Sequence, residues 1–195
     1  MNERFDDQRK ARIAKYTPLN EDELNSGAFD IAWFKSAHDT LGAKRFDMIY
    51  HAAKYISDGS KHSRARKYAD AVLGNFNEDE VKKVITEKRN KDFVMAFPLM
   101  PIKDEADIVS RYLFLQEFLK GSKKFGAQRI ASEKRAVEMA MYNLAMNAGY
   151  SDVTRLTLRM ETKVLEDSKE LFEEKVIEDV VVHLQVDEEG KTELT

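Results

Sequence analysis

A stripe of apolar residues at helical spacing in the second half of the chain constrains the fold most. Between residues 137 and 148, apolar side chains recur at every third or fourth position: Val137, Ala140, Met141, Leu144, Ala145 and Ala148. This spacing places them on one face of an α-helix. Gly149 follows where a left-handed C-terminal residue is expected, and Ser151 can cap a following helix. The sequence therefore predicts a tight helical hairpin here.

The same periodicity predicts helices along most of the chain. Only three prolines and eight glycines interrupt the sequence, and they fall where helices would end. Predicted helices span residues 6–16, 30–41, 43–56, 60–73 and 104–119, and further helices begin after the capping residues Asn20 and Asn77. Residues 58–60 read as a turn. The apolar run 93–100 lies beside Pro98 and Pro101, and we interpret it as an extended linker.

The pattern changes near the C-terminal end. Residues 176–186 are rich in β-branched side chains and alternate, 188–190 read as a turn, and 191–195 begin a returning strand. Because an isolated hairpin is marginal in water, we expect the natural chain to continue, or another part of the fold to cover this edge.

The expected fold is mainly α: a multi-helix bundle or loose HEAT-like helical array with a C-terminal β-hairpin. We divide it into a charged helical lead-in (1–27), a first helical subdomain (28–100) and a second, truncated helical subdomain ending in the hairpin (101–195).

Composition excludes several classes of protein. Acids and bases nearly cancel to a net charge of −3, whereas a general nucleic-acid coat is basic overall. The absence of cysteine excludes disulfide scaffolds, thiolate metal sites and thiol nucleophiles. The charged N-terminus does not resemble a secretory signal, and no apolar run approaches the length of a membrane span. We expect a soluble, cytoplasmic protein with no membrane partner.

Side chains typical of catalysis or metal binding form no recognisable motif. The four histidines lie on separate predicted elements: His38, His51, His62 and His183. Residues 121–126 have the glycine spacing of a phosphate-binding loop, but Ala127 and Gln128 replace its lysine and its serine or threonine. We therefore expect no enzyme, no catalytic residue, no metal and no cofactor. We interpret Trp33 as a helix anchor rather than a ligand-stacking residue.

Two clusters of basic residues could contact the phosphates of a nucleic acid. One begins the helix predicted after residue 60, and the other surrounds the connection near residue 125. The candidate contacts are Lys61, Arg64, Arg66, Lys67, Lys123, Lys124 and Arg129. A solvated surface, or pairing with the many nearby acids, is the favoured alternative. Aromatic residues for stacking bases are scarce, and Phe125 is the only one inside the second cluster.

Several strings resemble a known group of proteins. They are residues 33–35 through 41–42, 52–56, 62–71, 111–119, 124–129 and 147–150. Together they resemble an internal region of large bacterial proteins with a C-terminal domain of unknown function (DUF 4132 type), some labelled molybdate-metabolism-regulator-like and bearing a WGR domain. The resemblance covers roughly residues 28 to 195. It implies a fragment of a longer chain of helical, partly HEAT-like segments, with a nucleic-acid link through the WGR association. It supplies no catalytic residues.

Three functions stay open from the sequence. The first is an interaction or scaffold module of a larger bacterial cytoplasmic protein, which contacts other domains of its parent chain or a protein partner. The second is a nucleic-acid-binding accessory module that uses the basic clusters. The third is part of an enzyme whose site lies outside these residues.

Overall fold

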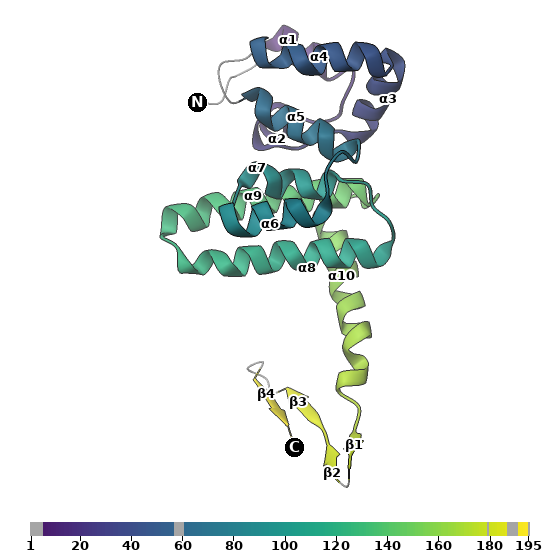
Figure 1. Cartoon of the computed structure of the whole chain (residues 1–195), viewed down its shortest axis with the longest axis vertical. Coiled ribbons are helices and arrows are strands. Elements are labelled where there is room, and N and C mark those ends of the chain that lie inside the picture. The colour runs from purple at the N-terminus through teal and green to yellow at the C-terminus, as the bar shows by residue number, and fades with distance from the viewer. Residues whose placement is uncertain (1–5, 57–60, 179, 187–190, 195) are drawn as a thin grey trace. The chain divides into compact units, whose positions relative to one another are not determined.

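The computed structural model describes residues 6–56, 61–178, 180–186 and 191–194, and groups the chain into two compact units, Met1–Val153 and Thr154–Thr195. The helices of the first unit are α1 (Asp7–Ile13), α2 (Glu21–Ser26), α3 (Ile31–Leu41), α4 (Ala43–Ile56), α5 (Lys61–Val72), α6 (Glu78–Lys88), α7 (Lys91–Ala96), α8 (Glu105–Gly121) and α9 (Ala127–Asn147) (Figure 1). Two short 3-10 turns accompany them, η1 (Phe97–Leu99) and η2 (Ser122–Lys124). The mainly-α class is confirmed.

Capping residues set the helix ends where the sequence predicts them. Asn20 forms a capping box with Glu23 at the start of α2, because its side chain accepts from the Glu23 amide and its own amide donates to the Glu23 carboxylate. Gly27 then ends α2 with a φ of 109°, which favours glycine. Asn77 caps α6 in the same way that Asp30 caps α3. The predicted turn at 58–60 lies outside the described residues.

The core of the first unit is built around residues 91–100. The interpretation of this run as an extended linker is wrong, since α7 and η1 are helical and contact α5 and α9. The Asn90 side chain caps α7 by accepting from the amides of Asp92 and Phe93. Every residue from Val94 to Met100 is buried. Consecutive buried residues show no amphipathic period, so periodicity could not reveal the helical turns here.

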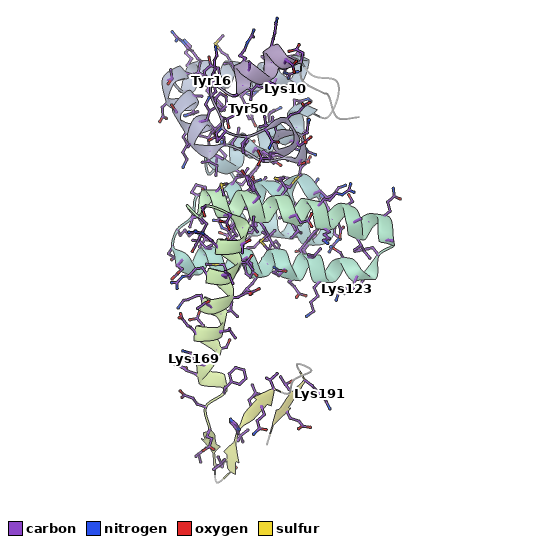
Figure 2. The ribbon with its side chains drawn as sticks, turned by 180° about the vertical axis from the view of Figure 1, so that it is seen from behind. Lys10, Tyr16, Tyr50, Lys123, Lys169 and Lys191 are labelled. Carbon is purple, nitrogen blue, oxygen red and sulfur yellow. The ribbon has the colours of Figure 1, made fainter. Side chains whose placement is uncertain are left out.

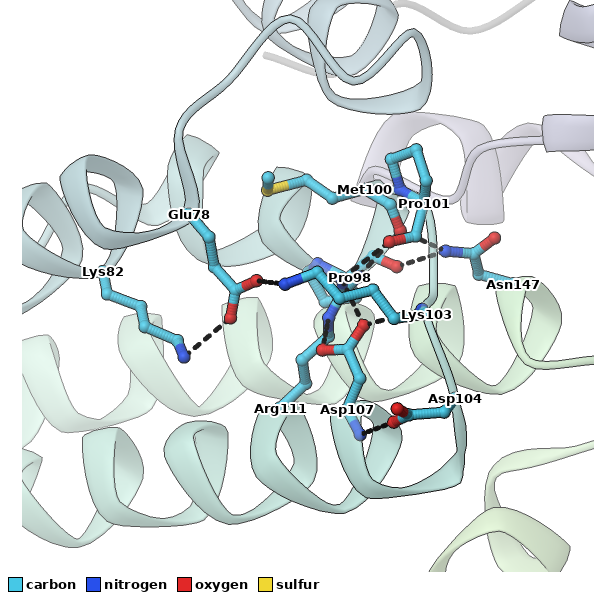
Figure 3. A network of polar contacts seen from close by, with 10 residues as sticks. All are labelled: Glu78, Lys82, Pro98, Met100, Pro101, Lys103, Asp104, Asp107, Arg111 and Asn147. Carbon is cyan, nitrogen blue, oxygen red and sulfur yellow. Dashed lines mark hydrogen bonds and ion pairs between the residues drawn. The ribbon is translucent and has the colours of Figure 1, made fainter.

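A buried polar network holds the segment that follows η1 (Figure 3). Arg111 of α8 is 1% exposed and donates to the backbone carbonyls of Met100 and Pro101. Its guanidinium also donates twice to the Asp107 carboxylate, at 2.8 Å. Asn147 donates from α9 to the carbonyls of Pro98 and Met100. The irregular backbone therefore finds its hydrogen bonds in side chains of two helices.

The N-terminal helices join this core through α5 and through the loop before α3. Tyr68 of α5 packs edge-on against Phe29 in that loop. The buried Asn143 of α9 accepts from the Phe29 amide and donates to the carbonyls of Gly27 and Met95. On α4, Phe46 packs against Phe34, whereas Ile49 is 53% exposed.

The second unit contains most of α10 (Val153–Ser168), the turn η3 (Lys169–Leu171) and four short strands, β1 (Lys175–Ile177), β2 (Val180–Val182), β3 (Leu184–Val186) and β4 (Thr192–Leu194). Each strand pairs antiparallel with one neighbour, β1 with β2 and β3 with β4. The C-terminal hairpin is confirmed by the pairing of Val186 with Thr192, although its turn at 188–190 lies outside the described residues. The single strand predicted over 176–186 is divided by a turn, where Glu178 has a φ of 57°.

Two further points bear on organisation. The two compact units divide the chain after Val153. The subdomain boundaries that we expected after residues 27 and 100 stay predictions. Among the described helices, none has both the length and the apolar character needed to cross a bilayer.

Candidate functional site

The first basic cluster is largely engaged by one carboxylate. Asp92, at the start of α7, accepts from Arg64 Nε at 2.9 Å and from Lys67 Nζ at 3.2 Å. Burial alone would raise the pKa of Asp92, but the bond from Arg64 and the charges of Lys67 and Arg64 together lower it. Two of the candidate phosphate contacts are therefore paired with an acid from another helix.

The second cluster contains a similar arrangement around Glu133 of α9, which is 2% exposed. Arg89 donates to both oxygens of this carboxylate, and Arg129 and Ser122 each donate to one of them. The bonds from Arg89, opposed by burial, lower the pKa of Glu133 to about 2. The Arg129 guanidinium also lies over the Phe125 ring, 3.9 Å from its centroid. Arg129 thus closes a polar cluster that joins α6 to the α8–α9 connection.

The remaining candidates differ from one another. The Arg66 guanidinium lies over the Tyr50 ring at 4.3 Å, and its buried Nε has no hydrogen-bond partner among the described residues. Lys123 and Lys124 are exposed and form no hydrogen bond or ion pair within the described part of the chain. Figure 2 shows Lys123 at the turn between α8 and α9, with its side chain directed outward. The Lys61 side chain lies outside the described residues.

A small apolar pocket lies between α1, α2 and α3. It has a volume of 230 Å³ and is lined by Ile13, Tyr16, Thr17, Leu24, Ala28, Phe29, Asp30 and Trp33. Trp33 is 46% exposed and Tyr16 is 63% exposed, so both rings remain accessible to solvent. The interpretation of Trp33 as a helix anchor stays a prediction. No sequence signal marks this pocket directly, because helical periodicity does not tell which side of a short helix remains uncovered.

The one acid of that lining is already hydrogen-bonded. Asp30 accepts from the Thr17 hydroxyl at 2.7 Å and from the Trp33 amide at 2.9 Å. These bonds fix the chain leaving α1 against the start of α3. The Asp30 carboxylate thus shapes the pocket, and the pocket surface offered to a ligand is mainly apolar.

Comparison with known proteins identifies a family whose model covers most of the chain. The family described as "Family of unknown function (DUF5724)" matches residues 1–160. No curated protein matches the chain, and no solved structure matches it.

Proposed function

Because the chain belongs to a family of unknown function, DUF5724, we propose a function from its own surface: it is a helical interaction module of a larger bacterial cytoplasmic protein, with no catalytic site of its own. Its contacts are other domains of the parent chain or a protein partner. As part of the same proposal, the larger protein is of the DUF 4132 type and belongs to the group that includes WGR-domain proteins.

The pocket beside Trp33 carries the proposal. Its 230 Å³ lies below the roughly 300–1,000 Å³ typical of small-molecule sites, and suits an apolar side chain presented by another protein surface. Tryptophan and tyrosine are enriched among residues that dominate binding energy at protein interfaces. Tyr16 and Trp33 flank this pocket and remain exposed. These properties favour recognition of a polypeptide over chemistry on a small substrate.

The pairing of basic residues favours the same function over nucleic-acid binding. Arg64 and Lys67 bond to Asp92, and Arg129 bonds to Glu133. A phosphate backbone would have to compete with these carboxylates for each cation. Lys123 and Lys124 are the exposed candidates that form no ion pair within the described part of the chain, and two lysines are few for the multiple phosphate contacts that nucleic-acid affinity needs.

Site-specific photocrosslinking in cells tests the proposal. A benzophenone amino acid replaces Tyr16 in the full-length parent protein, since this rim residue is already an exposed aromatic. We expect one dominant adduct, either within the parent chain or with a single partner. The adduct should be lost when Trp33→Ala is added, because the pocket then lacks the larger of its two exposed aromatic rings.

The matched control carries the same crosslinker at Leu113, an exposed apolar residue on α8. Identical adducts from positions 16 and 113 would contradict the proposal, as would the absence of any adduct from position 16. Since Trp33 is the only tryptophan, its fluorescence gives a second readout. Its emission should move to shorter wavelength when the crosslinked partner, once purified, covers the pocket.

A further inference from the structure

A second hollow in the first unit brings Arg64 of the first basic cluster together with Lys91 and Arg135. This groove has a volume of 530 Å³ and is lined by Asn25, Ser26, Arg64, Lys91, Asp92, Met95, Ser132, Arg135, Ala136, Glu138, Met139, Tyr142 and Val153. Its three cations come from three different helices, α5, α7 and α9. Its size falls within the roughly 300–1,000 Å³ usual for small-molecule sites.

The groove is lined by more positively charged side chains than negatively charged ones. Each of its two carboxylates is paired with a lysine outside the lining: Asp92 with Lys67 at 3.2 Å, and Glu138 with Lys134 at 3.9 Å. Lys91 Nζ bonds to the Ser132 hydroxyl at 2.7 Å, and forms no ion pair among the described residues. The Arg135 guanidinium has neither a hydrogen bond nor an ion pair within the described ranges. Two positive groups therefore face the groove without a carboxylate of their own.

A spare hydrogen-bond donor lies beside the apolar wall. The buried Tyr68 hydroxyl has no partner among the described residues. A Cβ added to Gly27 would lie 2.8 Å from this oxygen, 3.0 Å from Met95 Sδ and 3.6 Å from Met139 Cγ, so the hydroxyl and these two lining residues surround Gly27. Burial raises the pKa of Tyr68, and the group therefore stays protonated and able to donate near neutral pH.

We propose that this groove binds a small phosphate-bearing molecule, with its phosphate between Lys91 and Arg135 and its uncharged part against Met95 and Met139. A guanidinium can donate two parallel hydrogen bonds to phosphate, and an ammonium adds a compact charge beside it. Arg64, already bound to Asp92, closes the cationic side of the groove. The proposal is independent of the interaction function, because the Trp33 pocket and this groove share no lining residue.

Calorimetric titration of the full chain with inorganic pyrophosphate tests the site. Arg135→Ala and Lys91→Ala should each weaken binding by about tenfold or more, the effect of losing one charged hydrogen bond. Arg135→Lys should retain part of the affinity, because it keeps the charge but loses the two-pronged geometry. Circular dichroism establishes that each variant is folded.

The matched control is the double variant Lys123→Ala and Lys124→Ala, which removes exposed charges outside the groove. Its affinity should stay within about twofold of the unmodified chain. Equal losses from the control and from Arg135→Ala would overturn the proposal, because binding would then follow net charge. Absence of pyrophosphate binding at low salt, or equally tight binding of citrate, would overturn it too. So would a single-stranded oligonucleotide that binds more tightly and depends on Lys123 and Lys124.

Discussion

At the scale of single residues, the Glu133 carboxylate accepts hydrogen bonds from three side chains, those of Arg89, Ser122 and Arg129. Replacing it by glutamine removes the charge that pairs with Arg89 and Arg129. Loss of one partner from a buried ion pair leaves the other uncompensated, and we expect Glu133→Gln to lower the free energy of unfolding by about 2 kcal/mol or more. Urea denaturation at neutral pH measures this. The exposed Glu117→Gln on α8 is the control and should change stability by less than about 0.5 kcal/mol.

The same residue gives a signed pH dependence. The pKa of Glu133 is lowered from 4.5 in the unfolded chain to about 2 in the folded one. A lowered carboxyl pKa stabilises the fold above the unfolded value, and this contribution is lost as pH falls from 4.5 toward 2. The stability difference between the unmodified chain and Glu133→Gln should therefore be full above about pH 5 and shrink below it. A difference that is constant from pH 6 to pH 2.5 would contradict the assignment.

The sequence shows only part of this residue-scale chemistry. Arg129 and Glu133 are four positions apart on one helix, a spacing that predicts their pairing. Arg64 and Asp92 are 28 positions apart, and Arg89 and Glu133 are 44 apart. Only the packing of separate helices brings these pairs together. The sequence could therefore suggest that the basic residues pair with acids, but not which acids they pair with.

At the scale of elements, α2 depends on its caps more than on its packing. It is six residues long and has no buried residue. Removing the Asn20 side chain should cost about 1 kcal/mol and expose the first amides of the helix. We expect Asn20→Ala to increase hydrogen exchange at the Glu23 and Leu24 amides, while Asn20→Asp, which keeps a capping oxygen, should preserve protection. Equal exchange in the two variants would show that tertiary contacts hold α2.

The sequence predicted helices correctly where one face of the helix is exposed to solvent and capping residues mark its ends. The bounds of α3 and α4 follow from Asp30, Gly42 and the apolar spacing between them. It failed for α7 and η1, since the unbroken run of buried residues 94–100 shows no alternation of apolar and polar faces. It also joined β1 and β2 to β3, because alternation continues across the turn at Glu178 and does not report a change of backbone direction.

At the scale of the whole molecule, the buried apolar residues lie between Leu19 and Met160. Among the residues after Met160 whose side chains the structure describes, none is buried. A chain ending at Ser168, which lacks η3 and all four strands, should therefore unfold cooperatively in urea with a free energy within about 0.5 kcal/mol of the full chain. A loss of several kcal/mol would show that the two hairpins stabilise the helices. The family match, which covers residues 1–160, includes the whole of this buried set.

The buried Asn143 also has a consequence for the order of events during synthesis. Its amide donates to the carbonyl of Gly27, 116 positions earlier in the chain. At ribosomal speeds of roughly 5–20 residues per second, on the order of ten seconds separate the appearance of these two groups. Over that interval the loop before α3 has no partner at this position, and its docking must await α9. The N-terminal helices are therefore synthesised first, but their hydrogen bond to Asn143 can form only after α9 has been synthesised.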